Sequence, residues 1–267
     1  MTGPTDKPKV VAIIQARMAS VRLPDKTMAD IVGRPLLAHV IERVKTSDTV
    51  DEIVVAATTE VEDEVILRLA DEQGVQGYAG SPDDVLDRFY QAARRAEADI
   101  IVRITADDPF KDPGVIDKIV EYFLRHPGMA YVSNTIEPTF PEGIDIEVFS
   151  LAGLERAWRE ARLPSEREHV TPYIWKQPAK FKVANVRHSV DLSHLRWTVD
   201  YEEDLVFARA VYARLYRGEV FLMEDILGLL RSQPDLATIN QGIERNAGYV
   251  ASLRKDPAPP EAGDDDE

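Results

Sequence analysis

Short β-branched runs alternate with amphipathic stretches in the first half of the chain, and this alternation constrains the fold more than any other feature. The apolar runs VVAII, EIVVAAT, ADIIVRIT and AYVSNT occupy residues 10–14, 52–58, 98–105 and 130–135. Apolar residues at three- and four-residue spacing predict helices over residues 35–45, 62–74, 83–97 and 113–126. Strands separated by helices in this way form parallel βαβ units, so we expect an α/β fold.

The pattern changes after residue 135. Ile144, Ile146 and Val148 alternate as in a half-buried strand, and a helical pattern follows over residues 151–163. We expect further strands over 180–188 and 195–201 and a helix over 203–217. We interpret residues 136–190 as an inserted or edge lobe within a single domain over 10–255, preceded by a flexible N-terminus over 1–9. Residues 256–267 combine prolines with an acidic run, which predicts a disordered tail.

Composition excludes several classes of protein. The chain has 47 acidic and 32 basic residues and a net charge of -15, which argues against a general nucleic-acid binder. The absence of cysteine excludes disulfides, thiolate metal sites and thiol nucleophiles. No apolar run approaches the roughly 20 residues that cross a bilayer, so no membrane partner is expected. The N-terminus MTGPTDKPK lacks the apolar segment of a signal peptide, which predicts a cytoplasmic location.

A basic loop, QARMASVRLPDK, follows the first predicted strand. It places Arg17, Arg22 and Lys26 at the carboxyl end of that strand, where open α/β sheets bind their ligands. Guanidinium groups and small hydroxyls such as Ser20 suit a phosphate chain. Neither the Walker pattern nor G-x-G-x-x-G occurs, which disfavours a P-loop kinase and a Rossmann dehydrogenase. The alternative interpretation is that these cations are solvated loop charges.

Carboxylates follow two of the predicted strands. Asp107 and Asp108 lie just past residue 105, and Asp200 lies in the run RWTVDYEED. Mg2+ suits such an arrangement, because it takes one or two carboxylates and completes its shell with waters and phosphate oxygens. The alternatives are an Asp-Asp-Pro turn that caps local backbone, and an N-cap for the helix that begins near Glu202.

Seven segments, in this order, resemble the cytidylyltransferases that activate sugars and related compounds: IIQARMASVRLPDK, GRPLLAHVIERV, GSPDDVLDRFY, VRITADDPF, FPEGIDIEVFS, SEREHVTPYI and TVDYEEDLV. The family includes 3-deoxy-manno-octulosonate and acylneuraminate cytidylyltransferases, and the resemblance is greatest to the spore coat polysaccharide biosynthesis protein F branch. It implies a Rossmann-like, glycosyltransferase-A-like, mainly parallel sheet flanked by helices, with an inserted β-rich lobe for acceptor binding and dimerisation.

The resemblance also implies a function. A Mg2+-dependent nucleotidyltransferase of this kind transfers CMP from CTP to a sugar, a sugar acid, or an acceptor that bears a phosphate or phosphonate, and it releases pyrophosphate. A homodimer is expected, with PYIW at 172–175 supplying apolar area. Two alternatives stay open on the sequence, namely a nucleotide-sugar glycosyltransferase with the same sheet topology and a noncatalytic nucleotide-binding protein.

Matching the family's motifs residue by residue assigns roles to individual positions. Arg17, Lys26 and Asp107 match catalytic residues, and Asp107 and Asp200 match the metal-binding carboxylates. The residues expected to contact the nucleotide are Gln15, Ala16, Arg17, Ser20, Arg22, Lys26, Ser81, Asp84, Arg88 and Asp107. The residues expected to contact the acceptor are Asp145, Glu147, Arg167, Glu168 and His169.

Three positions depart from the family's pattern. Asp25 stands where a glycine is usual, and we expect the turn to survive because Asp tolerates a positive φ better than most residues. Asp108 stands where a neutral residue is common, and it either strengthens metal binding or faces solvent. Tyr201 stands where a small hydroxyl residue is commoner, and its ring is expected to narrow the acceptor pocket.

Overall fold

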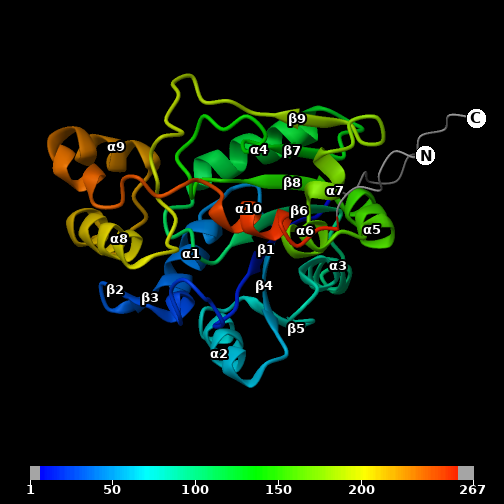
Figure 1. The fold of residues 1–267 in the computed structure, drawn as a ribbon, viewed down its shortest axis with the longest axis horizontal. Helices are drawn as coiled ribbons and strands as arrows, with labels where there is room; N and C mark the ends of the chain where they lie inside the picture. The colour runs from blue at the N-terminus through cyan, green and yellow to red at the C-terminus, as the bar shows by residue number, and fades with distance from the viewer. Residues whose placement is uncertain (1–6, 258–267) are drawn as a thin grey trace, which may run out of the picture.

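A seven-stranded sheet forms the centre of the protein in the computed structural model, which describes residues 7–257 (Figure 1). The strand order is β5-β4-β1-β6-β8-β7-β9. The strands are β1 (Val10–Gln15), β4 (Glu52–Thr58), β5 (Gln76–Gly80), β6 (Ile100–Thr105), β7 (Tyr131–Ser133), β8 (Glu147–Ser150) and β9 (Val183–Asn185). Only β8 runs antiparallel among these strands, so the predicted mainly parallel α/β sheet is confirmed.

Residues 1–6 and 258–267 lie outside the described residues. The predicted flexible N-terminus and the predicted disordered acidic tail lie mostly within these residues. The structure therefore does not address those two predictions.

Helices cover both faces of the sheet because β1 is apolar on both sides. Val10, Ala12 and Ile14 pack on one face with α1 (Leu36–Lys45), α2 (Glu64–Glu72) and α4 (Pro113–Arg125). Val11 and Ile13 pack on the other face with α3 (Val85–Arg95) and α5 (Leu151–Glu160). All five strand residues are fully buried, as expected for a central strand of a parallel sheet covered by helices.

Local sequence signals place several element ends. Gly74 adopts φ +64° just after α2, and Pro113 occupies the first turn of α4. The N-cap of α3 is Asp84, whose side chain accepts a hydrogen bond from the Asp87 amide at 2.9 Å. Among the strands, the pattern does not reveal β5, because its sequence QGYAG contains no β-branched residue.

The expected β-rich lobe over residues 136–190 is corrected by the structure. This segment instead supplies β8 and β9 to the central sheet and three helices, α5, α6 (Pro164–His169) and α7 (Pro172–Trp175). β8 joins the sheet because Val148 and Phe149, both fully buried, point to its two covered faces. The α7 residue Ile174 is also fully buried in the chain's own core, so PYIW does not offer an apolar interface.

The remaining elements lie at the edges of the sheet. The strand predicted over 195–201 is wrong, since the structure has only one bridge there, between Glu142 and Arg196. The predicted helix over 203–217 is α8 (Glu202–Leu215). The sequence analysis did not identify α9 (Met223–Ser232) or α10 (Ala247–Leu253), and α10 packs beside α6 (Figure 1). The short elements are η1 (Lys26–Met28), β2 (Asp30–Ile31), β3 (Arg34–Pro35), η2 (Val61–Asp63) and η3 (Pro234–Thr238).

None of the helices in residues 7–257 combines the length and the apolar character that crossing a membrane requires.

Gly143 lies where two distant segments cross closely. It adopts φ +101°, and a Cβ at this position would lie 2.6 Å from the carbonyl carbon of Trp197 and 2.7 Å from the amide nitrogen of Thr198. The crossing is held by the Trp197 amide, which donates to the Glu142 carbonyl at 2.7 Å. Glycine is required here for both its backbone conformation and its size.

We predict that Gly143→Ala lowers the free energy of unfolding by about 3–5 kcal/mol, because backbone strain and a clash with backbone atoms add. Gly218→Ala is the matched control, since Gly218 also has a positive φ of +93° but no atom within 4 Å of an added Cβ. We expect a loss of about 1–2 kcal/mol for the control. Denaturant unfolding measures both, and equal losses would contradict the close crossing.

Candidate active site

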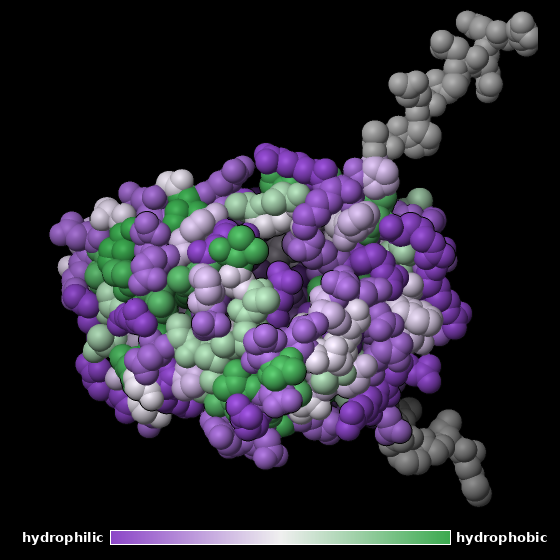
Figure 2. Space-filling view, turned by 60° about the horizontal axis from the view of Figure 1, so that its bottom comes forward, coloured by the Kyte–Doolittle hydropathy of each residue, from purple (hydrophilic) through white to green (hydrophobic). Residues whose placement is uncertain are grey.

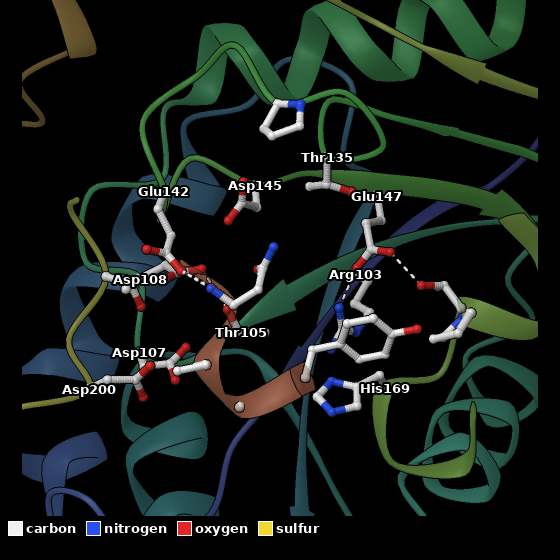
Figure 3. A pocket seen from close by; sticks show the side chains of 18 of the residues that line it. Arg103, Thr105, Asp107, Asp108, Thr135, Glu142, Asp145, Glu147, His169 and Asp200 are labelled. Carbon is white, nitrogen blue, oxygen red and sulfur yellow. Dashed lines mark hydrogen bonds and ion pairs between the residues drawn. The ribbon is translucent and has the colours of Figure 1, made fainter. Parts of the chain in front are cut away.

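A cavity of about 440 Å3 opens beside the carboxyl end of β6 and extends under α10. Figure 2 shows a hollow near the middle of one face of the molecule, with hydrophilic residues along one side and apolar residues along the other. In Figure 3, Asp107 and Asp200 lie together at one end of the cavity, and Glu147 and Arg103 lie at the other. The two ends therefore differ in the groups that they offer a ligand.

Lys26 joins three parts of the chain at the first end of the cavity. Its ammonium lies 2.6 Å from Asp107 Oδ2, 2.7 Å from Asp200 Oδ1 and 2.9 Å from the carbonyl oxygen of Val199. Arg22 adds a second cation, with its Nη2 2.6 Å from the same oxygen of Asp200. The basic loop and the two acidic segments, more than 80 residues apart, thus converge as the sequence predicts.

The charges at this end stabilise one another. Burial disfavours the charged form of Lys26, which is 8% exposed, but Asp107 and Asp200 raise its pKa above the ordinary value. Burial likewise disfavours charge on Asp107, but the charge and hydrogen bond of Lys26 hold the pKa of Asp107 well below its usual range. Lys26 and Asp107 are therefore both charged at neutral pH.

The two carboxylates fit a hard cation such as Mg2+. Both lie within hydrogen-bond distance of one ammonium, so both can reach a single cation, and oxygen is the donor that Mg2+ prefers. Within residues 7–257, no group of three or more His, Asp or Glu side chains is placed to hold a metal. Two carboxylates are enough for Mg2+ when waters and substrate phosphates supply the other oxygens.

A further pair of cations lies where the loop meets α3. Arg17 is exposed, while Arg88 is only 2% exposed and donates from Nη1 to the carbonyl oxygen of Ser81. Burial, and then the nearby charge of Arg17, lower the pKa of Arg88 to about 10. Two like charges held together in this way are suited to an anion, whose binding would relieve their repulsion.

The other loop residues of the predicted nucleotide site mainly shape the backbone. Gln15 Oε1 accepts a hydrogen bond from Arg103 Nε at 3.1 Å, and the amide of the buried Ala16 bonds to a carbonyl of β4. Ser20 Oγ accepts from the Leu23 amide at 3.4 Å. These contacts fix the course of the loop between β1 and η1.

Asp25 adopts φ +57° and is exposed, so the turn persists without the usual glycine, as expected. Its neighbour Lys26 still points to Asp107 and Asp200.

Two of the predicted acceptor residues, Arg167 and Glu168, lie outside the cavity lining. Arg167 donates to the Asp84 carboxylate, at 3.0 and 3.1 Å from Nε, and thereby ties α6 to the start of α3. Glu168 accepts from Ser252 Oγ at 2.8 Å. Neither residue is among those that line the cavity, and Asp84 is occupied as a helix cap and ion-pair partner. These contacts support structural roles for Arg167 and Glu168, so their binding of an acceptor stays a prediction. The sequence carries no signal for ion pairs between distant segments.

The environment of the Asp108 side chain also differs from what we expect from the sequence. It is 4% exposed, lies 2.7 Å from Lys111 Nζ and accepts from Thr105 Oγ1 at 2.6 Å. Burial raises the pKa of Asp108 above its ordinary value. The side chain therefore neither faces solvent nor joins Asp107 at the Lys26 ammonium.

The three remaining acceptor candidates, Asp145, Glu147 and His169, line the cavity. Glu147 is held by hydrogen bonds from Arg103, Thr171 and Tyr131, the last at 2.7 Å. Burial disfavours its charge, but the charge of Arg103 and these hydrogen bonds lower the pKa of Glu147. Asp145 Oδ1 accepts from Arg245 Nη2 at 2.7 Å.

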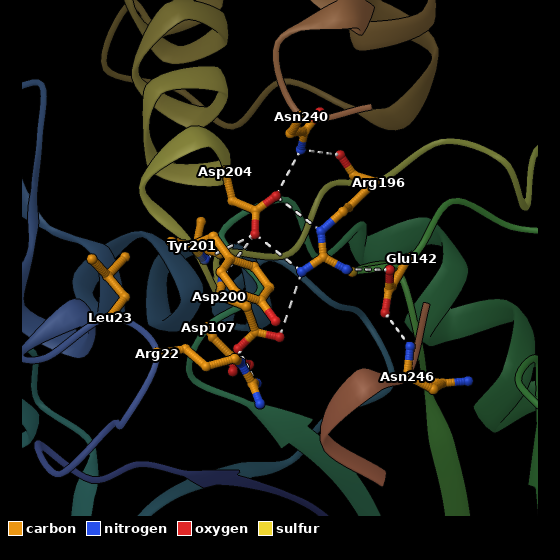
Figure 4. A network of polar contacts seen from close by, with 12 residues as sticks. Arg22, Leu23, Asp107, Glu142, Arg196, Asp200, Tyr201, Asp204, Asn240 and Asn246 are labelled. Carbon is orange, nitrogen blue, oxygen red and sulfur yellow. Dashed lines mark hydrogen bonds and ion pairs between the residues drawn. The ribbon is translucent and has the colours of Figure 1, made fainter. Parts of the chain in front are cut away.

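Arg196, which the sequence analysis did not single out, organises the wall behind Asp200 (Figure 4). It donates to both oxygens of Asp204, at 2.9 and 3.0 Å, and to Glu142 at 2.6 Å. Burial disfavours its charge, but the bonds to Asp204 and the charge of Glu142 raise the pKa of Arg196. Tyr201 does not line the cavity, which corrects its expected role. Its ring instead lies 5.7 Å from the Arg22 guanidinium and 5.8 Å from that of Arg196.

His169 is uncharged at neutral pH. Its Nε2 lies 2.9 Å from Ser252 Oγ, and its ring meets Tyr249 edge-on with centroids 4.9 Å apart. Burial, followed by the charge of Arg103, lowers the pKa of His169 to about 4 from the ordinary 6.5. The imidazole therefore takes part in the site as a neutral hydrogen-bonding group.

We predict that the ring resonances of His169 stay at their neutral-imidazole position as the pH falls from 8 to 5. Between pH 6.5 and about 4 the unfolded chain binds this proton and the folded chain does not, so acidification through that window removes stability. NMR titration measures the midpoint, and His169→Asn assigns the signal. A midpoint at or above 6.5 would contradict the buried environment.

Comparison with known proteins adds to this geometry. A family model described as cytidylyltransferase matches residues 11–225. The spore coat polysaccharide biosynthesis protein SpsF of Bacillus subtilis is 30% identical over 237 residues, which are 86% of this chain and 97% of that protein. A 3-deoxy-manno-octulosonate cytidylyltransferase of Trichlorobacter lovleyi is 36% identical over 123 residues, 45% of this chain and 47% of that protein.

Among solved structures, a cytidylyltransferase from Leptospira borgpetersenii serovar Hardjo-bovis superimposes with a TM-score of 0.84 at 34% identity. The match covers 89% of this chain and 100% of that one.

Proposed function

The chain belongs to the cytidylyltransferase family and is a nucleotidyltransferase, and from that premise we propose that it transfers CMP from CTP, with Mg2+, to a sugar acceptor. One observation carries the proposal. A cationic loop at the end of β1 meets two carboxylates, Asp107 and Asp200, next to a cavity large enough for a small molecule.

The proposed reaction is an in-line substitution at phosphorus. An acceptor hydroxyl loses its proton to solvent as its oxygen forms a bond to the α-phosphorus of CTP. The bond from that phosphorus to the oxygen that bridges to the β-phosphorus breaks, and pyrophosphate leaves. The chain's own residues mainly position charge. Arg17, Arg22 and Lys26 would bind the phosphate oxygens, on which negative charge grows as the leaving group departs.

Asp107 and Asp200 would hold Mg2+. When bound there, this ion supplies neutralisation of charge on the phosphate oxygens. Lys26 uses its three N–H donors on Asp107, Asp200 and the Val199 carbonyl. A phosphate contact by this ammonium therefore requires that it release at least one of these partners.

The acceptor end of the cavity favours hydroxyl groups over a second phosphate. Besides Asp107 and Asp200, four carboxylates line the cavity, and each already has a basic partner, in the pairs Asp108–Lys111, Glu142–Arg196, Asp145–Arg245 and Glu147–Arg103. A dianionic acceptor would have to break one of these pairs or face a carboxylate, whereas sugar hydroxyls donate to carboxylates without breaking them. We therefore place a sugar or sugar acid ahead of phosphate- and phosphonate-bearing acceptors.

The donor and the reaction type are tested together by pyrophosphate release. The protein is incubated with CTP, ATP, GTP or UTP, Mg2+, and a panel of probes: 3-deoxy-manno-octulosonate, N-acetylneuraminate, a sugar 1-phosphate and 2-aminoethylphosphonate. A nucleotide-sugar glycosyltransferase or a noncatalytic binding protein would release no pyrophosphate from CTP.

We predict that Asp107→Asn lowers kcat/KM for CTP by about 100-fold or more, because a carboxylate that holds Mg2+ is lost. The matched control is Asp71→Asn, which makes the same chemical change on an exposed face of α2. Pyrophosphate assays compare the two, and thermal melts confirm that both are folded. Turnover near the wild-type value in Asp107→Asn would remove this residue from the metal site.

The homodimer and the cytoplasmic location stay predictions. Because Tyr173 and Ile174 are buried within their own chain and Trp175 is partly buried, PYIW offers little apolar area to a second copy.

A further inference from the structure

The C-terminal segment Arg245–Tyr249 closes the cavity on the side that faces α6 and α7. Asn246, Ala247, Gly248 and Tyr249 all line it. The match to the family model ends at residue 225, so this wall lies beyond the part of the chain that the model describes. Residues outside the matched region therefore form this part of the pocket.

Polar contacts fix this segment at both ends. Arg245 pairs with Asp145 at 2.7 Å, and the Asn246 amide donates to Glu142 Oε1 at 3.0 Å. Past the segment, Ser252 Oγ lies within 2.9 Å of both Glu168 and His169.

Farther on, Asp256 accepts from the amide and the hydroxyl of Ser165 at 2.9 and 2.6 Å. A segment anchored on two sides of the cavity holds its side chains in place over the opening.

Gly248 brings the segment close to the nucleotide end. A Cβ at this position would lie 3.4 Å from Arg22 Nη1. Because Arg22 also contacts Asp200, the segment spans the cavity from the basic loop to α6.

The ring of Tyr249 is held by aromatic neighbours. His169 meets it edge-on at 4.9 Å, Trp175 lies 6.2 Å away, and the Lys176 ammonium is 5.3 Å from the ring centroid. The Tyr249 hydroxyl, however, is shielded from solvent and has no hydrogen-bond partner within residues 7–257. An unpaired buried hydroxyl is unfavourable, and a side-chain movement that turns it into the cavity would let a ligand supply the missing partner.

We propose that Tyr249 is a specificity-determining residue for the acceptor, and that its hydroxyl hydrogen-bonds to an oxygen substituent of the acceptor sugar. This inference rests on the proposed function. The position agrees with that role, because Tyr249 shares its wall with His169 and Trp175, whereas Asp107 and Asp200 lie at the nucleotide end. Tyr249 thus selects the acceptor and takes no part in the chemistry at phosphorus.

Tyr249→Phe tests the proposal, because it removes only the hydroxyl. Pyrophosphate release is measured with CTP, Mg2+ and the most active probe of the panel above, and the CTP dissociation constant is measured by calorimetry without acceptor. We expect the acceptor KM to rise about tenfold, with kcat within about threefold of wild type and CTP affinity within about twofold. Thermal melts confirm that the variant is folded.

Tyr122→Phe is the matched control. Tyr122 lies in α4, stacks on His126 just after that helix, and does not line the cavity. The control should leave all three constants unchanged. An acceptor KM for Tyr249→Phe equal to wild type overturns the inference alone, as does a loss confined to CTP affinity. Wild-type protein that binds no CTP and releases no pyrophosphate with any probe overturns the proposed function, and the inference with it.

Discussion

The ammonium of Lys26 between Asp107 and Asp200 is the contact on which the rest of the site depends. Those two carboxylates come from segments more than 90 residues apart, and without a cation between them they would repel each other in a partly buried place. The fold provides the meeting point, because β1 and β6 are neighbouring parallel strands whose carboxyl ends lie at the same edge of the sheet. The charge that stabilises this free protein is also the charge that a triphosphate needs.

The two ends of the cavity, which we propose bind the nucleotide and the acceptor, are built by different means. The proposed nucleotide end uses loops that leave the central strands β1 and β6, and its cations Arg17 and Arg22 are exposed. The acceptor end is assembled from β8, α6, α7 and the C-terminal segment, and its charges are already paired in the free protein. Such a division lets one phosphate-binding scaffold serve different acceptors through changes in the outer segments.

How far the sequence predicts the structure depends on how local each signal is. The apolar run from Val10 to Ile14 and the helical spacing of 113–126 are local patterns, and both elements form as predicted. The roles of Lys26 and Asp200 came from a resemblance, and their convergence depends on sheet order, which spacing alone does not give. The Arg167–Asp84 ion pair and α10 were missed for the same reason, since ion pairs and packing between distant segments leave no periodic trace.

A crystal structure of the protein with CTP and Mg2+ tests the central claim most directly. We expect the triphosphate along the loop of residues 17–26, Mg2+ bound by Asp107 and Asp200, and the Lys26 ammonium turned from at least one carboxylate toward a phosphate oxygen. A triphosphate bound away from this loop, or Lys26 still joined to both carboxylates with no phosphate within reach, would contradict it.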